Sequence, residues 1–269
     1  MSSIEPSSSS TTDVAEIDLR DITVRFGGLT ALDSVGLRVA PRRVHGVIGP
    51  NGAGKTTLFN VACGFVQPSS GSIHLRGAAR ARLRPHELAG LGIARTLQGL
   101  GLFDHLTVLQ NVVVGADRHA RSGFLRALFG SPGSSRDERA LRDRAMSTLS
   151  DLGVAEYAGR YPGSLPYPVR KRVALARALV SEPDLLLLDE PASGLSSDEI
   201  DELGQLIRSL SESMGVLLVE HHMDLVMKVC DEITVLDFGK VIAHGTPDEV
   251  RSDPAVLDAY LGESSEETS

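Results

Sequence analysis

Cysteine is scarce in this sequence. Cys63 and Cys230 are its only two cysteines, far apart and each inside an apolar helical pattern, with no C-x-x-C motif or histidine cluster nearby. This arrangement argues against a disulfide framework and against a zinc site. We expect two buried free thiols in a reducing cytosol.

An excess of positive charge is also lacking. The 27 Lys and Arg residues are outnumbered by 35 Asp and Glu residues, which gives a formal net charge of -8. Nucleic-acid binding relies on clustered Lys and Arg that neutralise phosphates, so this balance argues against a generic nucleic-acid binder. A local basic patch is still compatible with it.

Long apolar runs are absent as well. None approaches the roughly 18 to 20 residues that span a bilayer, and the longest candidates, such as residues 185–188, have the length of a buried strand. A role at a membrane would therefore require separate membrane subunits. The Ser-rich start lacks the basic and apolar regions of a signal peptide, so we expect a flexible tail over residues 1–13 and an acidic one over residues 263–269.

What remains is ordinary globular sequence, with 42% hydrophobic residues in a chain of 269. This length suits one large α/β domain with an attached lobe, expected over residues 14–262. A second domain of that size would have to come from another chain.

Two kinds of apolar pattern predict strands. From residue 17 to residue 39, apolar side chains recur near period two, which favours antiparallel strands at one edge of the fold. Residues 44–48, 185–188 and 216–219 are instead continuous apolar runs, and a helical pattern separates the last two. Such runs are typical of a parallel sheet covered on both faces. The fold class expected is therefore α/β, with an antiparallel β subdomain.

Helical spacing replaces these runs between residues 100 and 180, which predicts a helical lobe inserted into the core. Within it, residues 118–139 combine Gly, Pro and Ser around a short apolar stretch, and we expect a mobile insertion with one short helix there. Three helix starts are predicted by the capping boxes Thr107 with Gln110, Ser196 with Glu199, and Thr246 with Glu249.

A phosphate-binding loop is predicted by GPNGAGKTT at residues 49–57, which matches G-x-x-x-x-G-K-[ST] between a predicted strand and a predicted helix. Glycines let backbone amides curl around phosphates, and the helix N-terminus adds partial positive charge. Lys55 would reach the β- and γ-phosphates of ATP, and Thr56 would hold Mg²⁺. The nucleotide-binding residues expected from this motif are Gly49, Pro50, Asn51, Gly52, Ala53, Gly54, Lys55, Thr56 and Thr57.

The run LLLLDE at residues 185–190 supplies two carboxylates at the end of a buried strand. Asp189 would hold Mg²⁺, and Glu190 beside it is the candidate general base. A solvated charge at the strand end is the alternative for Glu190. No N-K-x-D motif that reads guanine is present in the sequence, which disfavours a GTPase.

At this point the chain resembles the ATP-binding-cassette (ABC) family, whose sequence elements occur in order over nearly its whole length. The resemblance implies a P-loop NTPase core of the ABC type, in which two such cores enclose two ATP molecules. It implies that Phe26 stacks on adenine, that Gln98 in ARTLQ contacts Mg²⁺ and the attacking water, and that His221 contacts the γ-phosphate. An ordinary strand aromatic is the alternative for Phe26, and His222 is expected to be a solvated residue at a helix start.

Within this family the sequence is similar to the LivG-type ATP-binding subunit of branched-chain amino-acid importers. The similarity lies in FGGLTAL at residues 26–32, GIARTLQ at 92–98, the run over 219–250, and AYLGE at 259–263. It implies an ATP-hydrolysing subunit at the cytoplasmic face of the membrane, which acts on permease subunits and indirectly on a solute-binding protein. Lipopolysaccharide-export and urea-import ATPases look much alike.

Two segments depart from the family pattern. Residues 193–196, SGLS, fill the D-loop position without its usual Asp, and residues 165–169, LPYPV, replace the signature LSGGQ, or LPYG-x-Q in LivG-like chains. Pro168 has no backbone N–H to offer a phosphate. Because the family's signature completes the ATP site of the partner chain, we expect a heterodimer with a second ABC ATPase. Arg170 and Lys171 are alternative side-chain donors.

Two rival functions remain on the sequence alone. One is a soluble ABC-type ATPase acting on nucleic acid or ribosomes, although such relatives usually carry a coiled-coil arm or a second cassette and this sequence has neither. The other is a regulatory ABC subunit that does not hydrolyse ATP, which Pro168 favours.

Overall fold

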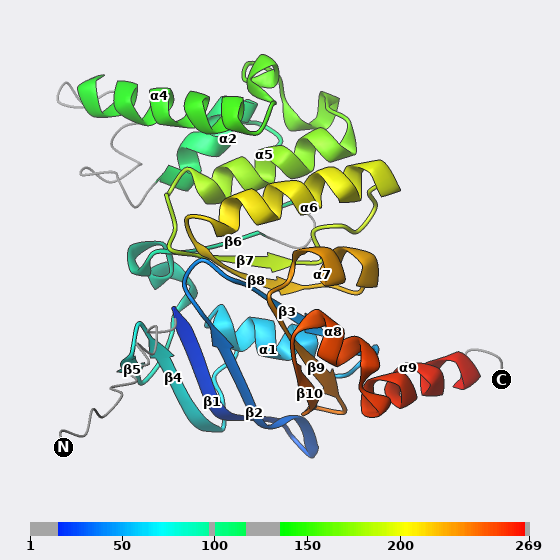
Figure 1. Cartoon of the computed structure of the whole chain (residues 1–269). Helices are drawn as coiled ribbons and strands as arrows, with labels where there is room; N and C mark the ends of the chain where they lie inside the picture. Colours follow the sequence, from blue (N-terminus) through cyan, green and yellow to red (C-terminus); the bar gives the residue numbers. More distant parts are fainter. Residues whose placement is uncertain (1–15, 97–99, 117–134, 267–269) are drawn as a thin grey trace, which may run out of the picture.

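The computed structural model describes residues 16–96, 100–116 and 135–266 of the chain (Figure 1). Its strands are β1 (Ile17–Phe26), β2 (Leu29–Val39), β3 (Val44–Ile48), β4 (Ser70–Leu75), β5 (Ala78–Arg80), β6 (Ile93–Arg95), β7 (Leu185–Asp189), β8 (Gly215–Val219), β9 (Glu232–Asp237) and β10 (Lys240–Gly245). Its α-helices are α1 (Lys55–Ala62), α2 (Val108–Gly115), α4 (Ser135–Asp151), α5 (Tyr167–Leu179), α6 (Ser197–Ser211), α7 (Met223–Val229), α8 (Pro247–Ser252) and α9 (Pro254–Glu266). Short 3-10 helices are η1 (Pro85–Glu87), η2 (Ala89–Leu91), η4 (Ala155–Tyr157) and η5 (Pro162–Ser164).

The alternating pattern near the N-terminus forms an antiparallel sheet of four strands in the order β2-β1-β4-β5. Strand β1 pairs with β2 from Ile17 opposite Val39 to Phe26 opposite Leu29. The expected antiparallel subdomain is therefore confirmed.

The continuous apolar runs form the middle of a second, six-stranded sheet in the order β10-β9-β3-β8-β7-β6. Neighbouring strands from β9 to β6 are parallel, and β10 is antiparallel to β9. In a parallel sheet the carboxyl ends of all strands meet at one edge, which is where ligands bind in open α/β folds. The loops that follow β3, β7 and β8 therefore lie together.

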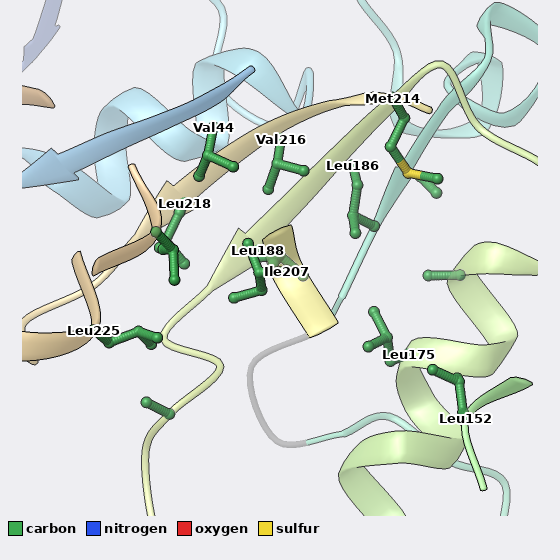
Figure 2. Packing of buried hydrophobic residues seen from close by; sticks show 14 of the residues in the cluster. Val44, Leu152, Leu175, Leu186, Leu188, Ile207, Met214, Val216, Leu218 and Leu225 are labelled. Carbon is green, nitrogen blue, oxygen red and sulfur yellow. The ribbon is translucent and has the colours of Figure 1, made fainter. Parts of the chain in front are cut away.

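The core is divided into two clusters by the six-stranded sheet. Leu186 and Leu188 of β7 point to one face, where Ile207 of α6 and Leu225 of α7 pack against them (Figure 2). The intervening side chains of the same strand point to the other face, where α1 fills the space between the two sheets (Figure 1). Each strand is thus buried on both sides, which explains its unbroken apolar sequence.

The predicted helical lobe consists of α2, α4 and α5, which pack on one another beyond α6 (Figure 1). All three capping boxes are present, at the starts of α2, α6 and α8. The expected insertion over residues 118–139 lies mainly outside the described residues, although residues 135–139 form the start of α4. At the other end, α9 continues to Glu266, into the stretch where we expected an acidic tail.

Both cysteines are buried free thiols, as predicted. Burial raises the pKa of Cys63 and of Cys230 to about 12, so neither thiol is poised to react. In the part of the chain that the structure describes, no helix is both long enough and apolar enough to cross a membrane.

Candidate active site

The phosphate loop connects the end of β3 to the first residue of α1, as the motif requires. Gly54 occupies the N-cap position with a left-handed backbone, at φ 104°. The ammonium group of Lys55 donates to the carbonyl oxygens of Gly49, at 2.6 Å, and Pro50, at 2.7 Å. The Lys55 side chain therefore reaches back from the start of α1 to the first two residues of the loop. The side chain of Thr56, also at the helix start, is exposed.

Two glycines of this loop are dictated by close backbone approaches. A Cβ atom at Gly49, where φ is 146°, would collide with the carbonyl oxygen of Leu236 in β9. At Gly54 a Cβ atom would lie 2.8 Å from the carbonyl oxygen of Ala31 in β2. The phosphate loop is thus pressed against both sheets, which leaves no room for side chains at these positions.

Asp189 and Glu190 follow β7 at the same edge of the sheet. Burial raises the pKa of Asp189 to about 6, the negative charges of Glu190 and Glu220 add to the rise, and Arg95 opposes it. Glu190 has a left-handed backbone, with φ at 46°, an uncommon conformation for a residue other than glycine. Its N–H donates to the carbonyl oxygen of Val219 at the end of β8, at 2.8 Å.

His221 is also brought to this edge, immediately after β8. Its Nδ1 atom lies 4.0 Å from a carboxylate oxygen of Glu190, and just over half of its side chain is exposed. The structure therefore brings together three sequence-predicted residues, Asp189, Glu190 and His221, from two neighbouring strands.

Glu220 lies between these residues and is fully buried. One of its oxygens accepts the N–H of Ala192 at 2.7 Å, and the other accepts the N–H groups of His221 and His222 at 2.8 and 3.1 Å. Burial by itself raises the pKa of Glu220, but the hydrogen bonds from His222, Ala192 and His221 outweigh it and hold the pKa below its ordinary value. His222 occupies the N-cap position of α7 and is half-buried, with its Nδ1 atom 3.0 Å from Glu220. Its position at a helix start agrees with the prediction, but its ring is bound to Glu220 instead of being simply solvated.

The segment over residues 165–169 leads into α5, with Pro166 at the N-cap position and Pro168 within the first turn. The ring of Tyr167 lies beneath two cations, 5.5 Å from the Arg170 guanidinium carbon and 5.3 Å from Lys171 Nζ. Lys171 donates to the carbonyl oxygen of Pro191 in its own chain, at 2.6 Å. Burial lowers the pKa of Lys171, against the opposing charges of Glu220 and Glu190.

The other two predicted residues are placed differently. Phe26 is the last residue of β1, and 52% of its surface is exposed. Strand β2, which follows, is linked to the phosphate loop through Gly239. The carbonyl oxygen of Gly239 accepts from the N–H of Asp33, and its own N–H donates to the carbonyl oxygen of Ala53. Gln98 lies outside the described residues. The strand before it, β6, pairs with β7, and Thr96 donates to the carbonyl oxygen of Leu187 at 3.0 Å.

Glu220 and the contact of Lys171 were missed by the sequence analysis. A charged residue directly after the buried strand over residues 216–219 was the available signal for Glu220, because the carboxyl ends of parallel strands form ligand sites. No comparable signal marked Pro191 as the partner of Lys171.

The sequence comparisons agree with this geometry. Residues 32–193 match the ABC transporter family, and residues 240–266 match the family described as branched-chain amino acid ATP-binding cassette transporter. The chain is 42% identical to the high-affinity branched-chain amino acid transport ATP-binding protein BraF of Pseudomonas aeruginosa, over 92% of this chain and 98% of that protein. It is 39% identical to the corresponding protein LivG of Escherichia coli K12, with the same coverage.

The fold has solved relatives of the same kind. A nucleotide-free ATP-binding cassette from an ABC transporter superposes with a TM-score of 0.78 at 30% identity, covering 91% of this chain and 98% of that one. The ADP conformation of MJ1267, another such cassette, also has a TM-score of 0.78 at 30% identity, covering 92% and 99% of the two chains. The chain thus belongs to the ABC transporter family, as an ATP-binding cassette that hydrolyses ATP.

Proposed function

We propose that this chain binds and hydrolyses ATP at the cytoplasmic face of the membrane. This hydrolysis drives import of branched-chain or other amino acids through separate permease subunits. The observation that carries the proposal is the meeting of the phosphate loop, Asp189 with Glu190, and His221 at one edge of the parallel sheet. The named substrates of the BraF and LivG relatives support amino acids as the solute.

In this proposal Glu190 is the general base that orients and deprotonates the attacking water. His221, whose Nδ1 atom lies 4.0 Å from the Glu190 carboxylate, contacts the γ-phosphate in this proposal. Gln98 contacts the attacking water. Lys55 exchanges its loop carbonyls for the β- and γ-phosphates when ATP binds, since both interactions satisfy the same ammonium donors. Phe26, exposed at the end of β1, stacks on adenine.

The carboxylates at the strand ends fit a divalent cation. Asp189 and Glu190 offer carboxylate oxygens there, and the charges of Glu190 and of buried Glu220 contribute to the raised pKa of Asp189. Oxygen donors of this type, together with the Thr56 hydroxyl and the Gln98 amide oxygen, are the ligands that Mg²⁺ prefers. When bound, Mg²⁺ would offset the negative charge that develops on the phosphates.

A docking surface for a permease is proposed at residues 100–107, the described part of the stretch that begins at Gln98. The buried amide of Asn111 holds this loop by accepting from the N–H of Phe103 and donating to the carbonyl oxygens of Phe103, Leu106 and Thr107. Arg177 of α5 donates to the carbonyl oxygens of Leu100 and Gly101. The loop therefore presents the half-exposed ring of Phe103 from a fixed backbone.

Cysteine cross-linking tests this surface. A cysteine at Leu102 or His105 should trap a permease loop in the assembled transporter, and the native thiols are buried and should contribute little background. A cysteine at exposed Glu212, at the end of α6, is the matched control and should not trap it. Failure at both test positions, in a transporter that remains assembled, would contradict docking there.

Reconstituted transport tests the function as a whole. The chain, assembled with its permeases, a second ATPase and a solute-binding protein in vesicles, should take up branched-chain amino acids only when MgATP is present, and Lys55→Ala should abolish uptake. ATP hydrolysis that responds to nucleic acid or ribosomes instead of the loaded solute-binding protein would favour the soluble rival function. MgATP binding without hydrolysis in the complete complex would favour the regulatory one.

A further inference from the structure

The short backbone segment that carries Glu190 is attached at each of its three residues. The N–H of Glu190 bonds to Val219, the carbonyl oxygen of Pro191 accepts from Lys171 at 2.6 Å, and the N–H of Ala192 bonds to Glu220 at 2.7 Å. The first of these bonds is a backbone contact that any sequence would make. The other two depend on specific side chains, one from α5 and one from the end of β8.

Glu220 joins this segment to the histidines that follow β8. Its two oxygens receive N–H groups from Ala192 on one side and from His221 and His222 on the other, and the ring nitrogen of His222 lies 3.0 Å away. A carboxylate bonded to several N–H groups is held firmly, because charge-assisted hydrogen bonds are stronger than neutral ones. Glu220 thereby sets the position of Glu190 relative to His221, whose Nδ1 atom is 4.0 Å from the Glu190 carboxylate.

Lys171 attaches the same segment to the helical lobe. It lies on the first turns of α5, the helix that begins at the segment over residues 165–169. Its ammonium nitrogen lies 5.3 Å from the centre of the Tyr167 ring and donates to the carbonyl oxygen of Pro191, next to Glu190. A shift of the start of α5 would therefore pull directly on the backbone beside the candidate base.

We propose that Glu220 and Lys171 are positioning residues for hydrolysis, which together hold residues 190–192 so that the Glu190 carboxylate stays beside His221. The inference rests on the proposed role of Glu190 as general base. Neither residue needs to touch ATP. Through Lys171, the position of α5 also affects the position of Glu190 in the same chain.

The left-handed backbone of Glu190 explains why the hydrogen bonds of Glu220 and Lys171, its anchors, are needed. Such a conformation is unfavourable for a residue with a side chain, so it persists only where the surroundings impose it. Without its anchors the segment would relax and the carboxylate would move. A displacement of about 1 Å in a catalytic group can lower the rate roughly a hundredfold.

Another role for Glu220 is less consistent with the geometry. The ligand atoms of Glu220, His221 and His222 lie within 4.8 Å of one another, which among the described residues makes them a candidate metal site. Both Glu220 oxygens, however, already accept N–H groups, and a bound cation would have to displace or repel these donors. The arrangement suits an internal hydrogen-bond centre.

The test compares Glu220→Gln and Lys171→Met with wild type in the full transporter complex. Both variants should bind ATP within about threefold of wild type, since neither side chain contacts the phosphate loop, and both should lower kcat roughly ten- to hundredfold. Lys171→Arg keeps a donor for Pro191 and should recover most of the lost kcat, a rescue that a purely packing role would not produce. The matched controls Glu212→Gln and Lys228→Met change the same residue types on exposed helix surfaces and should leave kcat unchanged.

The outcomes separate this inference from the proposed function. An inactive wild-type complex would contradict the proposed function itself. An active wild type with kcat retained within twofold in Lys171→Met, or lost equally in Lys171→Met and Lys171→Arg, would overturn the positioning role. If Glu220→Gln fails to fold, its melting temperature will reveal this, and the kcat values of Lys171→Met and Lys171→Arg relative to wild type decide the question.

Discussion

Glu190 is the residue on which the proposed chemistry depends most directly. It stands beside the carboxylate that is offered to the metal, its backbone is left-handed, and its side chain faces His221. A general base in this position acts on the water and contributes little to nucleotide affinity. Binding and hydrolysis should therefore separate on mutation.

Glu190→Gln should retain MgATP binding and lose hydrolysis by roughly 10²- to 10⁴-fold in the assembled complex. Lys55→Ala should instead weaken ATP binding, because it deletes the charge aimed at the phosphates. Equilibrium binding of a fluorescent ATP analogue and steady-state phosphate release distinguish the two effects. Turnover of Glu190→Gln within a few-fold of wild type would remove Glu190 from the mechanism.

His45 makes stability depend on pH. It is buried in β3, its Nε2 atom lies 2.8 Å from the Thr234 hydroxyl, and the ring of His244 stacks on it at 5.6 Å. Burial lowers the pKa of His45, the charge of His244 adds to this, and Glu232 partly opposes it. The unfolded chain therefore binds a proton more readily than the folded one.

Because the folded pKa of His45 is lowered, its contribution to stability is present above pH 6.5, the unfolded value, and is lost as the pH falls through the folded value. The free energy of unfolding should drop below pH 6.5 with a slope of up to about 1.4 kcal/mol per pH unit from this residue. When urea unfolding is measured across this pH range, the free energy of unfolding of His45→Gln should depend less steeply on pH than that of wild type. The matched control His86→Gln, on the surface, should leave the slope unchanged, and an unaltered slope in His45→Gln would refute the assignment.

At the scale of a single element, the start of α5 combines two effects of proline. Pro at the beginning of a helix is favourable for folding because its φ angle suits the first turn. At Pro168 it also removes a backbone N–H from the helix end that we propose faces a partner's phosphate. Folding and ATP binding therefore place opposite demands on this residue.

Pro168→Gly tests the second effect. Restoring one amide should raise hydrolysis in the partner-bound site roughly tenfold or more, the rate equivalent of a charge-assisted hydrogen bond worth about 1.5 to 3 kcal/mol. The glycine should also lower stability by about 0.5 to 1 kcal/mol through its greater freedom in the unfolded chain. Pro247→Gly, in the first turn of α8, is the matched control for the stability cost and should not change hydrolysis. An unchanged rate in Pro168→Gly would mean that Arg170 or other donors already serve the site.

In the assembled transporter, the residues that bind this chain's own ATP and the segment over residues 165–169 contribute to different ATP sites in our proposal. The chain's own phosphate loop, Asp189, Glu190 and His221 are all in place. We propose that the segment over residues 165–169 serves the ATP of the partner. A homodimer would carry this weak segment twice. We therefore propose a heterodimer with a second ATPase whose signature is complete, which gives one competent and one weakened site.

The asymmetry is measured by comparing Glu190→Gln with the equivalent glutamate variant of the partner in the purified complex. The ATP held by this chain meets the complete signature, so Glu190→Gln should abolish most hydrolysis and the partner variant should leave much of it. Equal losses in both variants would contradict the asymmetry. So would full cooperative hydrolysis by this chain alone.

The parts of the site that obey local rules were predictable from the sequence. The phosphate loop at residues 49–57 is recognisable because close approach of backbone and phosphate demands glycines at fixed spacing. The strands β3, β7 and β8 were predictable because burial on both faces requires continuous apolar runs, and the three capped helices because a cap acts within four residues. Strands β4, β5, β6, β9 and β10 were not foreseen, although the buried run at residues 233–236 in β9 is similar to the runs of β3, β7 and β8.

How these parts act on one another depends on the packing of elements that are distant in the sequence. In the sequence Glu220 is marked only by its place after a buried strand. The pairing of β7 with β8 brings the N–H groups of Ala192 and of the two histidines together on its carboxylate. Lys171 belongs to a basic helix start until the packing of α5 brings it to Pro191, 20 residues further along the chain. Contacts of this kind depend on where separate elements come to lie in space, and no local pattern encodes that distance.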